Sequence, residues 1–174
     1  MPAPFLVADT HFGHLGSTKF LCDDGSKMRP WDSVEEMDEA LVDNWNKVVG
    51  RKDRVYHLGD VAINRRALPI LNRLNGRLVL IKGNHDIFKL SDYTPYFDDI
   101  RAYHVLDKFI LSHIPIHAES KARFRGNIHG HLHQRKMADP WYRCVSVEQT
   151  GFAPIAFDEV RDSMVATLDH PQTG

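Results

Sequence analysis

Aspartate, asparagine and histidine side chains gather in this chain at the points where short apolar segments stop. The residues of this kind are Asp9, His11, Asp60, Asn84, His85, Asp86, His113, His131 and His133. Carboxylate oxygens and imidazole nitrogens are suitable ligands for divalent transition metals. Brought to one place, such groups would make a metal centre, and this is the chemistry that the sequence first indicates.

Two of the motifs place their side chains at alternate positions. Asp9 and His11 are separated by one residue, and so are His131 and His133. On an extended chain alternate residues point the same way about 6.6 Å apart, so the members of each pair are expected to share one face of the site. Each motif also has a plain alternative, because Asp-x-His occurs by chance on surfaces and Gly, Asn and Asp favour turns.

Three apolar, β-forming segments are expected to position the first motifs. These predicted strands cover residues 5–8, 55–58 and 78–81. The last of them runs into the sequence Gly83 to Asp86. A helical pattern between the second and third strands predicts a parallel crossover, and ligands of open α/β sheets bind at the carboxyl ends of such strands. His57, inside an apolar strand, is expected to be a hydrogen-bonded core histidine rather than a ligand.

Two helices are predicted from apolar spacing. The first covers residues 33–49, with Ser33 as N-cap and Glu36 completing a capping box. The second covers residues 64–75 and must accommodate Pro69 in its first turn or at a kink. The inward positions expected for the first helix are Val34, Met37, Leu41, Val42, Trp45, Val48 and Val49.

The second half of the chain is predicted to be mostly β, and residues 1–168 to form a single domain. Strands are expected at residues 100–105, 108–111, 124–128, 141–147 and 154–157. Residues 169–174 are expected to be a disordered tail. Residues 15–32 are expected to be a long loop, in which Lys19, Lys27 and Arg29 either meet a substrate phosphate or form a solvated edge.

Composition limits the possible partners. The chain has 174 residues, 43% hydrophobic and 26% charged, and a net charge of -1, so no global field favours DNA or a membrane. Cys22 and Cys144 are isolated, which is typical of reduced thiols in a cytoplasmic protein. No apolar run reaches the roughly 20 residues of a membrane span. Residues 2–8 lack a basic start and are interpreted as a strand rather than a signal peptide.

In sequence order the motifs resemble the signature of the calcineurin-like metallophosphoesterases. The matching blocks are Asp9 with His11, Gly59 with Asp60, Gly83 to Asp86, His113, and Gly130 to His133. The resemblance covers nearly the whole chain and is greatest to small prokaryotic and phage members. It implies an α/β fold, a four-layer α/β/β/α sandwich of two mixed sheets flanked by helices.

The resemblance also implies a dinuclear metal centre. One ion would be held by Asp9, His11, Asp60 and His133, and the other by Asp60, Asn84, His113 and His131. Oxygen and nitrogen ligands suit manganese, iron, zinc or nickel. Manganese is the first choice, as the family resemblance implies. A hydroxide bridging the ions would attack phosphorus. His85 would stabilise the phosphoryl group or protonate the leaving oxygen, and Asp86 would orient His85.

A small phosphorylated substrate is expected, and a phosphodiester of nucleotide type is favoured. Val61 follows Asp60 where protein phosphatases of this superfamily carry a phosphate-gripping Asp-Arg pair. His14, Arg51 and Lys52 are candidate substrate contacts. The alternatives are a phosphomonoesterase or nucleotide pyrophosphatase with the same site, and a non-catalytic scaffold of this fold. A nuclease is disfavoured, since no basic and aromatic stripe suits extended nucleic-acid binding.

Overall fold

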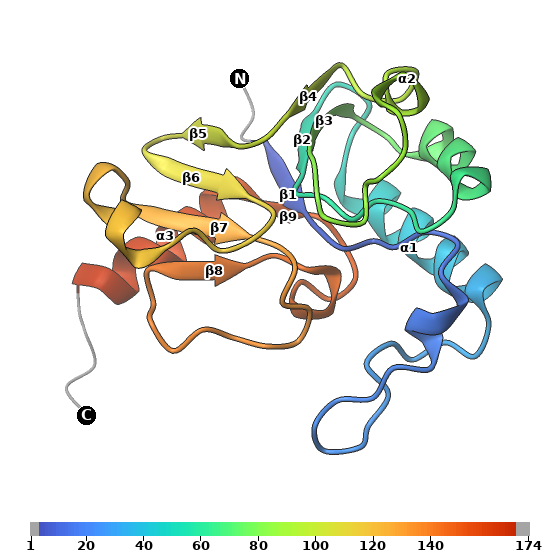
Figure 1. Cartoon of the computed structure of the whole chain (residues 1–174), viewed down its shortest axis with the longest axis horizontal. Helices are drawn as coiled ribbons and strands as arrows, with labels where there is room; N and C mark the ends of the chain where they lie inside the picture. Colours follow the sequence, from blue (N-terminus) through green and yellow to red (C-terminus); the bar gives the residue numbers. More distant parts are fainter. Residues whose placement is uncertain (1–3, 170–174) are drawn as a thin grey trace.

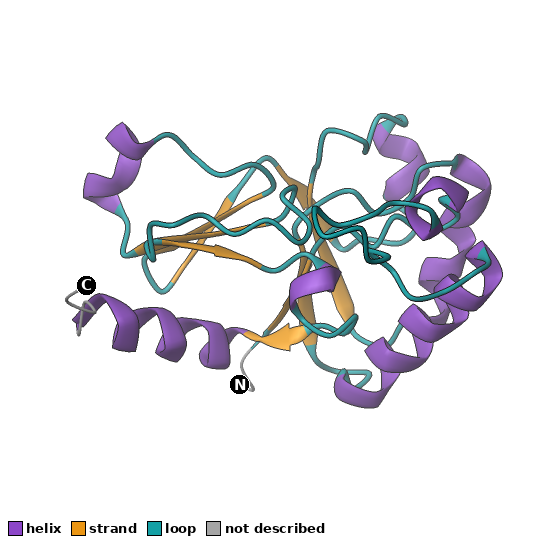
Figure 2. Ribbon diagram, turned by 90° about the horizontal axis from the view of Figure 1, so that it is seen from below, coloured by secondary structure: helices purple, strands orange, loops and turns teal. Residues whose placement is uncertain are grey.

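Two mixed β-sheets lie at the centre of the molecule, with helices on either side of the pair (Figure 1, Figure 2). The structure is a computed structural model that describes residues 4–169. The fold class predicted from the sequence, a sandwich of two mixed sheets flanked by helices, is confirmed.

The first sheet has five strands, and all but one are parallel. In spatial order they are β4 (Asp99–Arg101), β3 (Arg77–Ile81), β2 (Arg54–His57), β1 (Phe5–Val7) and β9 (Ile155–Ala156). Only β9 runs antiparallel to its neighbour β1. The predicted parallel crossover between the strands that precede Asp60 and Asn84 is therefore confirmed.

The second sheet has four strands. In spatial order they are β5 (His104–Leu106), β6 (Phe109–Ser112), β7 (Gly126–His129) and β8 (Tyr142–Cys144). β5 pairs antiparallel with β6, while β6, β7 and β8 are parallel. The carboxyl ends of β6 and β7 thus lie at the same edge, immediately before His113 and the segment containing His131.

Seven helical segments connect or cover the strands in the described part of the chain. They are η1 (Leu15–Thr18), α1 (Val34–Val48), η2 (Arg65–Arg73), α2 (Leu90–Tyr93), η3 (Ala118–Arg123), η4 (Val147–Gln149) and α3 (Phe157–Asp169). Apolar residues of α1 and η2 pack on one face of the first sheet. The opposite face packs against the second sheet, and α3 joins that second core.

Helix α1 begins as predicted, but its capping box is only half formed. Ser33 Oγ accepts a hydrogen bond from the Glu36 amide at 3.1 Å, whereas the Glu36 carboxylate accepts from the Asp32 amide. Val48, expected to face inward, is 44% exposed. It is the last residue of α1, and Val49 is buried instead, after the backbone has left the helix for an extended conformation.

The segment predicted as a second α-helix is a 3-10 helix, η2. Pro69 lies inside it and has no amide hydrogen to donate, so a regular α-helical ladder cannot run through this position. The Asn64 side chain accepts from the Ala67 amide at 3.0 Å and caps its start. Leu68 and Leu71 are still buried, so the apolar pattern identified the correct face in a different helix type.

Two other predictions are corrected. Residues 100–105 do not form one strand, because β4 ends at Arg101 in the first sheet and β5 begins at His104 in the second. Helix α3 was not foreseen, and Asp169, placed in the predicted tail, is its last residue. The remainder of that predicted tail, residues 170–174, lies outside the described residues.

The two sheets are joined at the ends of β1 and β8. An isolated parallel bridge pairs Ala8 with Ser146, and the Ala8 amide donates to the Val145 carbonyl at 3.1 Å. On its other side, the Asp9 amide donates to the Gly59 carbonyl at 3.0 Å. Motifs that follow strands of different sheets are thereby brought to one junction.

The Asp38 carboxylate gives a test of how α1 holds the loop after β1. It accepts from the Gly13 amide at 3.2 and 3.1 Å, yet burial raises the pKa of Asp38 to about 6. Because the folded-state pKa lies above that of the unfolded chain, the associated stability is complete below about pH 4 and is lost as the pH rises through about 6.

Asp38→Asn should therefore be more stable than the wild type at pH 7, by about 1 kcal/mol after discounting for solvent screening. The asparagine oxygen can still accept from Gly13. Urea unfolding at pH 4 to 7, with a chelator present, measures the difference, which should vanish near pH 4. An equal gain at every pH would contradict the prediction, and Asp43→Asn, at an exposed position of α1, is the matched control.

Candidate metal centre

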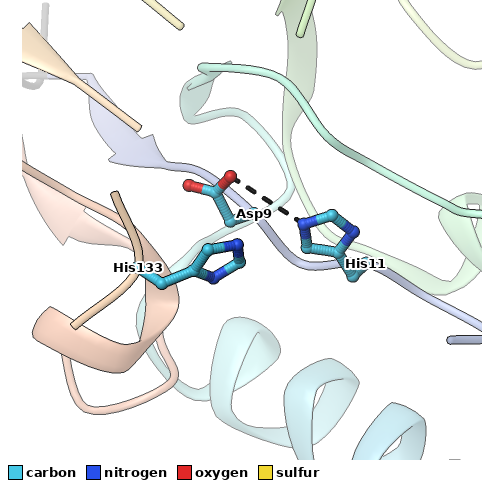
Figure 3. Close-up of side chains that lie close together, drawn as sticks. All are labelled: Asp9, His11 and His133. Carbon is cyan, nitrogen blue, oxygen red and sulfur yellow. Dashed lines mark ion pairs between the residues drawn. The ribbon is translucent and has the colours of Figure 1, made fainter. Parts of the chain in front are cut away.

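Two clusters of ligand-type side chains lie at the junction of the sheets. One contains Asp9, His11 and His133, and the other contains Asp60, His113 and His131. Within each cluster the candidate ligand atoms all lie within 4.8 Å of one another. Figure 3 shows the first cluster, in which His11 Nε2 lies 3.9 Å from Asp9 Oδ1. Each cluster could hold a metal ion.

Asp60 belongs to the second cluster and also faces His11 of the first. Its Oδ2 atom is 3.6 Å from His11 Nε2 and 3.4 Å from His113 Nε2. Its Oδ1 atom accepts a hydrogen bond from the His85 amide at 2.8 Å, which fixes the orientation of the carboxylate. A carboxylate in this position could serve ions in both clusters.

The second cluster brings together acceptor atoms that need a cation. His113 Nδ1 lies 2.7 Å from the Leu58 carbonyl oxygen, which can only accept, so Nδ1 carries the proton. In the neutral ring Nε2 then presents a lone pair, and it faces Asn84 Oδ1 at 2.8 Å and Asp60 Oδ2. Such an arrangement is stable with a metal ion or an additional proton between the acceptors. The pKa of His113 is raised because the Asp60 contacts outweigh burial.

The first cluster contains buried ligand atoms without a hydrogen-bond partner. Asp9 Oδ2 accepts from Ser146 Oγ at 2.6 Å and from the His131 amide at 2.8 Å. Asp9 Oδ1 and both ring nitrogens of His11 have no partner in the described part of the chain. Buried polar atoms normally find partners, and a metal ion would satisfy Asp9 Oδ1 and one His11 nitrogen.

The charge states also suit metal binding. Burial, followed by the Arg29 charge, lowers the pKa of His11 to about 2, so its ring is neutral near pH 7. Burial opposes ionisation of Asp60, but the His113 hydrogen bond and charge bring its pKa down to about 2. Burial raises the pKa of Asp9 to about 6, which indicates a carboxylate short of positive partners.

The ligands converge through turns rather than through an extended chain, which corrects the reasoning used to pair them. The φ angles are 58° at Asp9, 49° at His11, 58° at Asp60, 70° at His131 and 50° at His133. These left-handed conformations are unfavourable for residues with a side chain, at roughly 1–3 kcal/mol each. As a result, His131 and His133 point to different clusters although they are separated by one residue.

Arg29 and Glu148 support the first cluster, a role that the sequence did not indicate for either residue. Glu148 Oε1 lies 3.0 Å from His133 Nδ1, so this nitrogen can donate and leave Nε2 free. Arg29 Nε donates to the same oxygen at 2.9 Å. Arg29 was expected either to meet a substrate phosphate or to lie on a solvated edge. It is instead 0% exposed and also donates to the Asp9 and Thr10 carbonyls. Arg29 and Glu148 are 119 residues apart in the sequence, so no local sequence pattern could indicate that they pair.

His85 lies beside the clusters and is exposed. Its ring centroid is 5.6 Å from that of His11. Asp86, expected to orient His85, does something else, because its carboxylate accepts from the amides of Asp60, Val61 and Gly83 at 2.8, 3.0 and 2.8 Å. Asp86 therefore fixes the backbone that carries Asp60.

Only one of the predicted substrate contacts lies near the clusters. The His14 ring is 5.6 Å from the His11 ring. Arg51 and Lys52 lie in the turn before β2, whereas Asp60 follows the opposite end of that strand. They are at the wrong edge of the sheet, because residues that precede a parallel strand lie at its amino end, whereas the candidate ligands follow the carboxyl ends.

His57 is the core residue that the sequence predicts. It is fully buried, and its Nε2 lies 2.9 Å from Thr10 Oγ1. The Trp45 ring is stacked on it at 6.4 Å. His57 therefore braces the loop that contains Asp9 without belonging to either cluster.

Comparison with known proteins identifies relatives of this chain. The uncharacterized protein MJ1445 of Methanocaldococcus jannaschii is 35% identical over 170 residues, which cover 88% of this chain and 86% of that protein. The chain belongs to the same family as MJ1445. The gene 66 protein of Mycobacterium phage L5 is 36% identical over 93 residues, covering 49% of this chain and 41% of the phage protein. No family model matches.

A solved structure shares the fold of this MJ1445-family chain. It is the protein of unknown function AQ665 from Aquifex aeolicus, with a TM-score of 0.67 over 92% of this chain and 98% of that one. At 24% identity the likeness shows the fold alone.

Among residues 4–169, none of the helices has the length and apolar character needed to cross a membrane.

Glu148→Gln should weaken metal binding at the first cluster of this MJ1445-family protein. The substitution removes the charge that pairs with Arg29 and supports His133, and loss of such a supporting partner typically costs about 10- to 100-fold in metal affinity. Titration calorimetry with Mn²⁺ should show one weakened site and one site of wild-type affinity. Glu39→Gln, at an exposed ion pair with Arg73, is the control. Equal affinities for wild type and Glu148→Gln would refute the role.

Proposed function

We propose that this chain is a dinuclear metal-dependent phosphoesterase of the calcineurin-like type. The observation that carries the proposal is the position of Asp60, a member of the second cluster, whose Oδ2 faces both His113 of its own cluster and His11 of the first. Divalent cations held there would supply positive charge for the phosphoryl oxygens and lower the pKa of an attacking water. Oxygen and nitrogen ligands without thiolates suit manganese, iron, zinc or nickel alike. Manganese is the proposed ion because of the family resemblance.

His85 is the proposed catalytic residue of this chain. Its ring is exposed, next to His11, and belongs to neither cluster. Its own backbone amide is anchored on Asp60, so the ring is held at the edge of the ligand groups while remaining accessible to substrate. An imidazole in this position can stabilise a phosphoryl oxygen or give a proton to the leaving oxygen.

Phosphodiesters are the proposed substrates, in preference to phosphomonoesters. Val61 follows Asp60 where a phosphate-gripping Asp-Arg pair would favour a monoester, and the buried Arg29 is already bonded to Glu148 and to the Asp9 and Thr10 carbonyls. Phosphomonoesterase or nucleotide pyrophosphatase activity at the same ligands is the alternative.

Cys22 and Cys144 are free thiols, which supports the proposed cytoplasmic location.

The direct test compares bis-p-nitrophenyl phosphate with p-nitrophenyl phosphate, in the presence of Mn²⁺, Ni²⁺, Fe²⁺ or Zn²⁺. Faster turnover of the diester supports the proposal. A monoester preference of tenfold or more would replace it with the alternative activity. Absence of turnover with every metal would instead favour a non-catalytic scaffold.

His85→Ala should separate catalysis from metal binding. We expect kcat to fall by about two to four orders of magnitude, the range of an acid/base group, while metal content stays at the wild-type level. Asp60→Ala should lose metal from both clusters and activity with it. Elemental analysis of both purified variants, alongside kcat, makes the comparison, and metal loss in His85→Ala would show that His85 is a ligand.

A further inference from the structure

A cavity of about 440 Å³ adjoins the ligand clusters. It lies between the loop at residues 20–28 and the segment at residues 131–135, and its volume is in the range of small-molecule sites. His131 and His133 contribute to its wall, one from each cluster. A molecule whose phosphoryl group reached both clusters would therefore place one of its substituents in this cavity.

The loop at residues 20–28 forms the opposite wall and is held by backbone pairing within the loop. Leu21 and Lys27 form an antiparallel bridge, and the Met28 amide donates to the Phe20 carbonyl at 2.9 Å. Arg29, the residue directly after this loop, is fully buried and anchors its end. The conformation of the loop is thus tied to the same residue that supports the first cluster.

The loop presents apolar side chains to the cavity, and two of them are largely exposed to solvent. Phe20 is 44% exposed and Leu21 is 59% exposed, and both line the cavity together with Met28. The Phe20 and His14 rings are roughly perpendicular, at 76°, with centroids 5.6 Å apart, so the phenyl ring lies beside the site. Exposed apolar side chains grouped at a cavity are typical of a ligand-binding surface.

The remaining wall is polar. Asp23, Gln134 and Arg135 offer a carboxylate, an amide and a guanidinium around the apolar side chains. An alkyl chain would make no use of the Gln134 amide, and a second phosphate would meet the Asp23 carboxylate as well as the Arg135 guanidinium. A planar heterocycle satisfies both parts of the wall, because its face stacks on an aromatic ring and its edge takes hydrogen bonds.

We propose that this cavity binds the nucleoside part of a phosphodiester substrate, with the base against Phe20 and its edge toward Gln134 and Asp23. The inference rests on the proposed phosphoesterase function and specifies its substrate class. Hydrolysis adds water across one phosphorus–oxygen ester bond, so the nucleoside leaves as its monophosphate and the second alcohol leaves with the proton.

The test uses two substrates that share one leaving group. Thymidine 5′-(p-nitrophenyl phosphate) and methyl p-nitrophenyl phosphate both release p-nitrophenol and differ only in the retained group. The wild type should have a KM about tenfold or more lower for the thymidine ester, and in Phe20→Ala this preference should fall about tenfold, chiefly in KM. Phe20→Leu, which keeps apolar contact without an aromatic face, should resemble Phe20→Ala. Tyr103→Ala, an exposed aromatic outside the cavity, is the matched control.

A binding measurement separates the inference from the proposed activity. Calorimetry with thymidine 5′-monophosphate and methyl phosphate should show tighter binding of the nucleotide to the wild type and loss of this difference in Phe20→Ala. If neither ester is hydrolysed but this difference persists, the phosphoesterase proposal fails and the nucleoside site stands. Equal KM values and equal affinities for the two ligands would overturn the nucleoside site while leaving the phosphoesterase in place.

Discussion

The structure depends on holding several hydrogen-bond acceptors close together at the junction of two sheets. Asp60 Oδ2 faces the Nε2 atoms of His11 and His113, and Asp9 Oδ1 is buried without a hydrogen-bond partner among residues 4–169. Such a group of lone pairs is unfavourable unless a cation joins it. Backbone amides and one buried ion pair keep it in place, since Asp86 binds three amides around Asp60 and Arg29 binds Glu148.

Close backbone approach at this junction explains two of the glycines. A side chain at Gly83 would collide with the Asp60 carboxylate, and one at Gly130 would meet Ala8 Cβ at 2.6 Å and Asp9 Oδ2 at 2.8 Å. Neither glycine needs a positive φ angle; each is required for space beside a carboxylate. The positive φ angles are instead at the ligands themselves, where the surrounding hydrogen bonds offset their cost.

The sequence predicted most of the strands and the residues of the two clusters because these depend on local patterns. Apolar runs located β1, β2 and β3, and the polar residues directly after them are those that meet at the junction. Three features depended on distant contacts and could not be predicted. Helix α3 is stabilised by burial against both sheets, Glu148 acts through Arg29, and the orientation of Asp86 is set by amides of the preceding motif.

The segment that supplies His131 and His133 links the ligand clusters to the cavity beside them. Its backbone is held from outside by Gln149, whose Nε2 donates to the His133 carbonyl at 2.6 Å and to the Arg135 carbonyl at 2.9 Å. The same short stretch also presents Gln134 and Arg135 to the cavity. The side chains of residues 131–135 all extend from this one constrained backbone segment. A shift of the segment that widened the cavity would therefore also move His131 and His133, one candidate ligand in each cluster. Changes in what the cavity accepts should therefore occur in the loop at residues 20–28, which contributes none of the candidate ligands.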